Sequence, residues 1–259
     1  MLQCVLSCKP TICRERGHGE TPLAGDLIPL DMDVTRRLSE GFVGPLVLGV
    51  LGLVSIVLVF GFTSSTMYGV ASPANLLAYW HISLAWTAGI ALAVTFVGSV
   101  QYLRKRARFW NLLAAASGEI GFLMLTAAIV MGSLWASEIW GVFWSWGDVR
   151  LVTMFVAWFV YAGYLVVFNS TKDSEGRFAA TYGVIGFITI PLSFLSTRLW
   201  QPELHNPTIG GSGAEGTVIE PGTLVVSIVA ITLLYAVVVS LCLRIFELRD
   251  AVLRETGTR

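Results

Sequence analysis

Apolar residues fall into six long runs along the chain, separated by shorter polar segments. Each run approaches or exceeds the roughly 20 residues that a helix needs to cross a bilayer core. Because a backbone in lipid must satisfy its own hydrogen bonds, we predict that every run is a helix. The predicted spans are about 42–62, 79–102, 111–134, 151–168, 178–195 and 223–243. This pattern is typical of an all-α integral membrane protein with six transmembrane helices.

The six predicted spans form one membrane domain, residues 42–245, which lies between two polar segments. Residues 1–41 are expected to be a flexible cytoplasmic tail, and residues 246–259 are expected to be cytoplasmic as well. The first tail contains a cluster of cysteines whose spacing lacks the Cys-x2-Cys pair of common zinc sites. We expect reduced thiols there, with metal binding as the alternative. The three cysteines are Cys4, Cys8 and Cys13.

The distribution of Lys and Arg predicts the orientation in the membrane. An even number of spans places both termini on one side, and that side then holds all but two of the 17 basic residues. Because basic residues are retained in the cytoplasm, we expect both termini to lie on the cytoplasmic side. The membrane is expected to be the cell (inner) membrane. The outer connections are then 63–78, 135–150 and 197–222, and the two outer basic residues are Arg150 and Arg198.

Composition agrees with a membrane location and excludes one class of partner. Only 13% of the residues are charged, against roughly 25% in soluble domains, and the mean hydropathy is +0.72. The formal net charge is zero, so no electrostatic feature indicates nucleic-acid binding. Membrane lipid is therefore the expected surrounding of this chain.

The second outer connection contains an unusual number of tryptophans, followed by an acid and a base, Asp148 and Arg150. If the segment were helical, one face would present a flat aromatic surface that suits a planar, apolar ligand. The alternative is an ordinary interfacial aromatic belt, which accounts for one or two tryptophans at a helix end. The tryptophans are Trp135, Trp140, Trp144 and Trp146, and the helical face would contain Trp140, Phe143 and Trp144.

Two of the three histidines lie on the same predicted outer side as the tryptophans. His81 stands near the start of the second span, and His205 follows the fifth. Neutral imidazole is a common axial ligand of haem iron, and guanidinium groups such as those of Arg150 and Arg198 suit haem propionates. For each histidine alone, a polar interfacial role is the alternative. For the arginines the alternatives are membrane anchoring or pairing with Asp148 or another outer carboxylate.

The segment from Gly118 to Tyr164 resembles the cytochrome c maturation protein C family, whose members have a tryptophan-rich signature. The family pattern reads Trp-Gly-x-x-Trp-x-Trp-Asp-x-Arg-Leu. Trp140, Gly141, Trp144 and Trp146 match it in register, whereas Gly147 is an extra residue, so the acid and the base match after a shift of one. The resemblance extends over residues 40–245 and includes both outer histidines and the six-span layout.

The resemblance implies a haem-binding assembly factor for cytochrome c biogenesis rather than an enzyme. It implies that haem b is held transiently and without covalent bonds on the outer face, and is then passed to a haem chaperone. An ABC-type ATPase and a second membrane subunit would complete the complex. The implied axial ligands are His81 and His205, and the other implied contacts are Trp140, Trp144, Trp146, Asp148, Arg150 and Arg198.

Three other functions are alternatives to the assembly factor. A haem-transporting permease subunit of an ABC-type exporter would need a polar path through the spans, where Glu119 is the only carboxylate well inside. A cytochrome b with stacked haems needs about four histidines inside helices, more than this chain supplies. The larger synthetase branch of the tryptophan-rich proteins has more spans and more histidines. The sequence therefore favours the assembly factor, with the permease subunit as the alternative.

Overall fold

The computed structural model describes residues 43–67, 73–170, 176–200 and 219–255 of the 259-residue chain. These residues are almost entirely helical, which confirms the predicted all-α class for this part of the chain. The predicted amino-terminal tail lies outside the described residues. The helices are α3 (Val43–Met67), α4 (Pro73–Lys105), α5 (Arg108–Trp140), α6 (Val149–Ser170), α7 (Arg177–Gly186), α8 (Thr189–Trp200) and α9 (Pro221–Glu255).

Every predicted span corresponds to helix, but the helices extend beyond the predicted limits. The span predicted at 111–134 is part of a helix that continues to Trp140, and the span predicted at 79–102 is part of a helix that begins at Pro73. Hydropathy detects only the residues that suit lipid, whereas helical hydrogen bonding continues through polar residues outside it. Among the described residues, five segments are long and apolar enough to cross a membrane, and α3 contains a shorter apolar stretch, Leu46–Leu58. The count of six spans stays a prediction.

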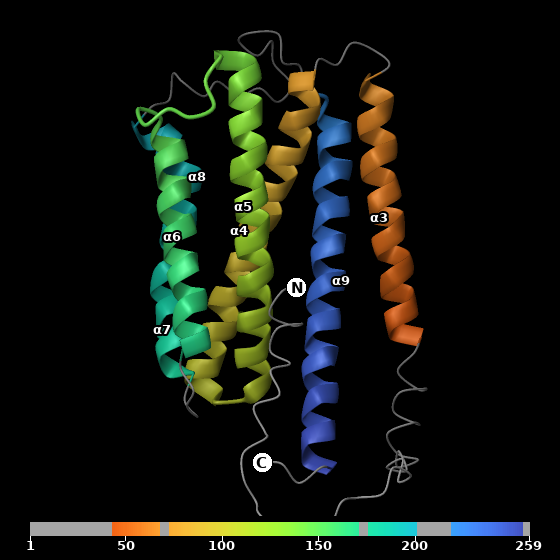
Figure 1. Cartoon of the computed structure of the whole chain (residues 1–259), viewed down its shortest axis with the longest axis vertical. Coiled ribbons are helices and arrows are strands. Elements are labelled where there is room, and N and C mark those ends of the chain that lie inside the picture. Colours follow the sequence, from red (N-terminus) through yellow and green to blue (C-terminus); the bar gives the residue numbers. More distant parts are fainter. Residues whose placement is uncertain (1–42, 68–72, 171–175, 201–218, 256–259) are drawn as a thin grey trace, which may run out of the picture.

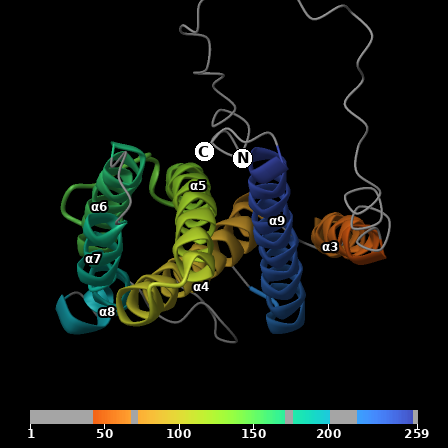
Figure 2. The same ribbon diagram turned by 90° about the horizontal axis from the view of Figure 1, so that it is seen from below.

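With α7 and α8 taken as one interrupted span, successive spans alternate in direction, so that the start of α3 and the end of α9 lie at the same end of the bundle (Figure 1). The tight α4–α5 turn and the start of α7 also lie at this end, which we call the basic end because it contains Arg104, Lys105, Arg106, Arg108 and Arg177. The opposite end contains the connection between α5 and α6, residues 141–148, and is called the loop end. Seen from below, α3 stands at the edge of the bundle beside α9 (Figure 2).

Small side chains allow α4 and α5 to pack closely over most of their length. Ala91 and Ala116 are buried, and a Cβ atom added at Gly98 would lie 3.1 Å from the backbone nitrogen of Ala114. Close approach through Gly, Ala and Ser is the usual way in which helices associate inside lipid, where no hydrophobic force drives them together. The two helices therefore form a rigid pair that positions any side chain placed between them.

Hydroxyl groups join this pair to α9. The Ser117 hydroxyl lies 2.6 Å from the carbonyl oxygen of Ala91, to which it donates, and 2.7 Å from the hydroxyl of Tyr235. About one helical turn closer to the starts of α4 and α9, the hydroxyls of Thr87 and Thr232 lie 3.2 Å apart. Each such bond between membrane helices contributes about 0.6 kcal/mol on average. The buried polar groups named here therefore connect α4, α5 and α9.

The fifth predicted span, 178–195, is interrupted near its middle. Helix α7 ends at Gly186 and α8 begins at Thr189, with a tight turn between them. Pro191 has no N–H to donate to the carbonyl of Phe187, and the N–H of Ile190 donates to that carbonyl instead, at 3.1 Å. The Thr189 hydroxyl also donates to the carbonyl oxygen of Gly186, at 2.7 Å. Proline chemistry thus divides this span into two shorter helices.

Candidate functional site

His81 lies between α4 and α5, with its ring seated on a glycine of α5. Its Nδ1 atom lies 2.8 Å from the carbonyl oxygen of Ala128. A Cβ atom added at Gly132 would lie 2.6 Å from both Cε1 and Nδ1 of the ring, so only a residue without a side chain fits there. Ala128 and Gly132 are four residues apart and therefore share one face of α5. We call Ala128 and Gly132 the histidine seat.

The bond to Ala128 defines the tautomer of His81 when the ring is neutral. A carbonyl oxygen only accepts hydrogen bonds, so the proton between the two groups must belong to Nδ1. The lone pair of the neutral ring is then on Nε2. Metal-binding histidines typically have this arrangement, with one nitrogen donating to a carbonyl and the other directed to the metal. The imidazole of His81 is therefore held in the form that a metal ligand requires.

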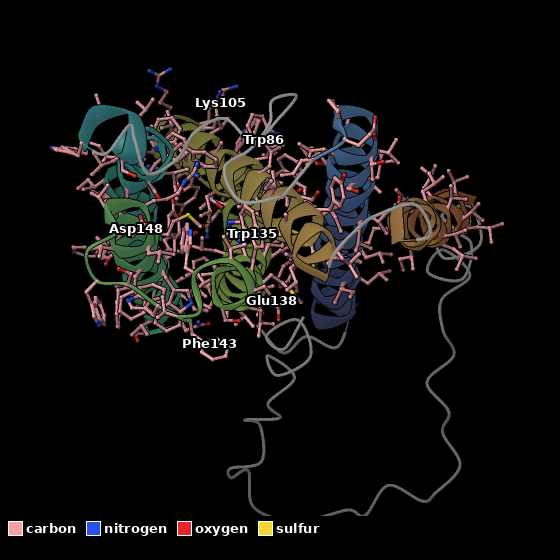
Figure 3. All side chains as sticks on the ribbon, turned by 90° about the horizontal axis from the view of Figure 1, so that it is seen from above. Trp86, Lys105, Trp135, Glu138, Phe143 and Asp148 are labelled. Carbon is pink, nitrogen blue, oxygen red and sulfur yellow. The ribbon has the colours of Figure 1, made fainter. Side chains whose placement is uncertain are left out.

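Trp135 borders His81 on the loop side. The two rings are 5.7 Å apart between centroids and inclined by 41°. The indole Nε1 of Trp135 is buried and has no hydrogen-bond acceptor among the described residues. Figure 3 shows Trp135 near the centre of the bundle, between α4 and α5. Trp135 was predicted only as part of the aromatic segment, and its contact with the histidine was missed.

The distance of His81 from the end of α4 can be compared with the thickness of a bilayer core. It is 24 residues before Lys105, which ends the helix, and this separation corresponds to about 36 Å of helix. A bilayer core is about 30 Å thick, so a helix anchored at Lys105 leaves the hydrocarbon near His81. The last two turns of α5, which contain Trp135, would then project beyond the hydrocarbon.

The tryptophan loop, residues 141–148, is not helical. Helix α5 ends at Trp140, because Gly141 adopts a left-handed conformation with φ of 70° and its N–H caps the carbonyl of Ser137. The chain then descends from the tip of α5 to the lower start of α6 (Figure 1). Trp140, Phe143 and Trp144 therefore do not share a helical face, and the helical arrangement considered for the sequence is incorrect.

The tryptophan loop folds back onto α6 through a cluster of aromatic rings. Trp144 lies 5.5 Å from Trp146 and 5.4 Å from Phe155, all between ring centroids, in edge-to-face orientations. Phe155 in turn stacks on Trp158, whose indole N–H donates to the hydroxyl of Thr126 in α5 at 2.9 Å. Edge-to-face pairs each contribute about 0.5–1.5 kcal/mol beyond burial. These contacts hold the loop in one conformation on α6.

Three aromatic side chains of this region are largely exposed, and one of them, Trp146, also belongs to the cluster on α6. Trp140 is 47% exposed, Phe143 is 62% exposed and Trp146 is 70% exposed. Figure 3 shows Phe143 at the rim of the bundle, away from Trp135. We call Trp140, Phe143 and Trp146 the exposed aromatic face. A cluster of large apolar groups at the end of a helix bundle is typical of a membrane interface or a binding surface.

Asp148 forms the amino-terminal cap of α6. Its Oδ1 atom accepts hydrogen bonds from the backbone N–H groups of Arg150, at 2.8 Å, and Leu151, at 3.3 Å. The residue is buried, and the N–H of Val152 donates to its carbonyl oxygen. Because the cap begins the helix here, the extra Gly147 lies in the non-helical loop. The extra residue therefore lies between two helices and does not turn one part of a helix relative to another.

Replacing Asp148 with alanine is expected to lower the free energy of unfolding by about 1 kcal/mol, the usual cost of a lost amino-terminal cap. Asp148→Asn keeps a side-chain oxygen that accepts the same two N–H groups, so it is expected to retain most of that stability. Unfolding in mixed detergent micelles measures both changes. An asparagine variant as unstable as the alanine variant would show that the charge of Asp148, and not its capping bond, is required.

The remaining predicted site residues are only partly described. Arg150 is half-buried at the start of α6, beside the cap. Arg198 lies in α8, near the loop end, and its side chain is outside the described residues, as is the whole of His205. The described part of the chain therefore places His81 and Trp135 together, Trp140 at the end of α5, and Trp144 and Trp146 in the tryptophan loop. It does not test whether the second histidine joins them.

Sequence patterns gave no indication of the histidine seat. Ala128, Gly132 and Trp135 follow a spacing of four and three residues, which places them on one face of a helix. That spacing becomes informative only once the pairing of α4 with α5 is known, because His81 is 47 residues away from Ala128.

Comparisons with known proteins agree with the resemblance noted for the tryptophan segment. The chain is 28% identical over 184 residues to heme exporter protein C of Bradyrhizobium diazoefficiens, a match that covers 69% of this chain and 66% of the relative. It is 32% identical over 131 residues to heme exporter protein C of Escherichia coli K12, covering 48% of this chain and 51% of the relative. It is 38% identical over 87 residues to cytochrome c biogenesis protein CcsA of Synechococcus sp. CC9605, covering 34% and 28%.

The chain thus covers less than two thirds of the length of each of these relatives. The family model described as cytochrome C assembly protein matches residues 30–205, which is more than half of the chain and includes α3 to α8. It contains His81, the histidine seat, the tryptophan loop and His205. The chain belongs to the cytochrome c assembly protein family.

Proposed function

We propose that this protein binds haem at the loop end and delivers it for the assembly of c-type cytochromes. The observation that carries the proposal is the state of His81, whose Nδ1–H donates to the carbonyl of Ala128 beside the indole of Trp135. Relatives named for haem export and cytochrome c biogenesis support haem as the cargo.

The described residues suit a haem cargo. An axial ligand must offer an imidazole lone pair, and the bond to Ala128 leaves that lone pair on Nε2 of His81. Trp135 adds apolar aromatic surface next to the ligand and a buried indole N–H that can donate to a haem substituent. Non-covalent binding by these groups is the form expected for haem b that is later released. His81 would bind the iron, and Trp135 would contact the cargo.

His205, Arg150 and Arg198 are the other residues that we propose for this cargo. His205 is proposed as the second axial ligand, and the two arginines as partners of the haem propionates. The support for them is the resemblance of the surrounding sequence to the family pattern and, for the arginines, their positions near the loop end. For Trp140, Trp144, Trp146 and Asp148 we propose a supporting role, in which the capped tryptophan loop borders the bound haem.

The basic end is proposed to face the cytoplasm, and the loop end the outside of the cell membrane. The concentration of Lys and Arg at the turns of the basic end supports this orientation. The relatives named heme exporter protein C support membership of a multisubunit complex. We propose an ABC-type ATPase, a second membrane subunit and a haem chaperone as partners, with a role in delivery and no catalytic step in this chain.

An absorption spectrum of the purified protein tests the cargo and its ligand. The intact protein is expected to carry haem with the spectrum of low-spin iron bound by two histidines. His81→Ala is expected to convert this to a spectrum with one histidine ligand or to remove the haem. His18→Ala, which changes the one histidine not assigned to the site, is the matched control and should keep the parental spectrum. Parental spectra and occupancy in His81→Ala would contradict the assignment of His81.

The alternative function, a haem-transporting permease subunit, is favoured by the word exporter in the names of two relatives. It predicts that vesicles containing this chain and an ATPase move haem across the bilayer when ATP is supplied. An assembly factor that only presents haem on one side would load an external acceptor without such movement.

A further inference from the structure

Gly132 is in closer contact with the His81 ring than any side chain would permit. A Cβ atom at this position would lie 2.6 Å from Cε1, 2.6 Å from Nδ1 and 3.5 Å from Nε2 of the imidazole. The contact joins α5 to α4 at the level where α4 is expected to leave the lipid. We infer that Gly132 is a positioning residue that sets the place and the tautomer of His81, and through them the affinity for haem iron. The effect on the affinity for haem iron rests on the proposed function.

The ring cannot move aside and keep its hydrogen bond. Ala128 lies one turn from Gly132 on the same face of α5, so a ring that is lifted off Gly132 is also lifted away from the Ala128 carbonyl. Trp135 follows on the same face of α5, with its ring centroid 5.7 Å from that of His81, and limits displacement toward the loop end. A methyl group at position 132 would therefore lengthen or break the 2.8 Å bond.

Loss of that bond changes which nitrogen carries the proton. A histidine side chain that is not held by a partner prefers the tautomer with hydrogen on Nε2, the nitrogen that would otherwise bind the metal. The Ala128 carbonyl selects the opposite tautomer. Loss of an outer-shell partner of this kind typically lowers metal affinity by about 10–100-fold. We therefore expect Gly132→Ala to weaken haem binding by about 10–100-fold and to remove the spectral contribution of His81.

Gly121→Ala is the matched control. Gly121 is on the same helix, three turns closer to the basic end, and it also faces α4 closely. An added Cβ there would lie 2.7 Å from Cδ2 of Leu92, which is the far end of a side chain and can move, and 3.1 Å from Cβ of Ala91. Both substitutions thus crowd the α4–α5 contact by one methyl group. Only the change at Gly132 touches the imidazole.

Nitrogen NMR of haem-free protein tests the tautomer without any cargo. The full chain with His18→Gln and His205→Gln keeps His81 as its one histidine and is labelled with ¹⁵N at the imidazole. We expect the neutral ring to carry its proton on Nδ1, to lose that preference in Gly132→Ala, and to keep it in Gly121→Ala. A neutral ring protonated on Nε2 in the parent, or a signal unchanged by Gly132→Ala, would overturn the inference.

A double-mutant cycle covers the case in which Gly132→Ala folds poorly. If the methyl group acts through the ring, combining it with His81→Ala removes the collision, and the double variant should unfold like His81→Ala alone. Equal destabilisation by Gly132→Ala with and without His81 would mean that the glycine serves helix packing only, and the inference would fail.

Haem titration of the natural chain separates this inference from the proposed function. A shifted tautomer with weaker haem binding in Gly132→Ala supports both. Parental protein that binds no haem refutes the proposed function and the effect on iron affinity, while the NMR result still decides whether Gly132 sets the tautomer. Haem that binds equally well to the parent and to Gly132→Ala refutes the positioning role alone.

Discussion

Simultaneous replacement of Trp140, Phe143 and Trp146 by alanine is expected to lower the yield of mature cytochrome c by at least about 100-fold while the protein still folds. The three rings are half to mostly exposed, and although Trp146 also contacts Trp144, the contact of Trp144 with Phe155 still holds the loop on α6. Exposed aromatic residues are the commonest anchors of binding surfaces, and truncation of each typically costs about 1–2 kcal/mol or more. Such costs are not additive, and a combined loss of about 2.8 kcal/mol is enough for a 100-fold change in affinity.

Haem staining of c-type cytochromes, in cells whose assembly depends on this chain, measures the result. The matched control replaces Phe178 in α7, Leu199 in α8 and Ile188 in the turn between them, three exposed apolar residues outside the tryptophan loop. This control should assemble cytochrome c at the parental level. Trp144 is left unchanged because it is half-buried against Phe155 and its loss would release the loop. Normal assembly by the aromatic triple variant would exclude the exposed aromatic face as a contact surface.

Tyr164→Ala is expected to lower the free energy of unfolding by about 3–5 kcal/mol, the usual cost of truncating a large buried side chain. Tyr164 is 1% exposed and belongs to a core cluster to which α4, α5, α6, α7 and α8 all contribute. Its ring fills the space left by two glycines. An added Cβ would lie 2.6 Å from the ring at Gly118 in α5 and 3.1 Å from it at Gly183 in α7.

Unfolding in mixed micelles, followed by loss of helical circular dichroism, measures this change. Phe159→Ala on the same helix is the control, since Phe159 is mostly exposed and the cost there is expected to stay near 0.5 kcal/mol. Equal costs for the two variants would show that Tyr164 does not join the helices in the way described.

Several features of the fold follow from local chemistry, including some that were not predicted. The helical spans follow from hydropathy alone, because lipid leaves the backbone no other partner. The cap at Asp148 is readable from an acid directly before an apolar run, and the break before Thr189 from the proline at 191. The ends of α4 and α5 do not follow from hydropathy, because both helices continue past the apolar residues that define the predicted spans.

The sequence by itself determined that the chain is a helical membrane protein, that four of its nine tryptophans lie within residues 135–146, and that His81 is a candidate ligand. Only the tertiary structure decided what surrounds that histidine. The seat on Ala128 and Gly132 depends on how α4 packs against α5, and a shift of that pairing by one residue would place a different group under the ring. Local patterns contain no information on such a register, because it is set by the packing of small residues along the whole length of both helices.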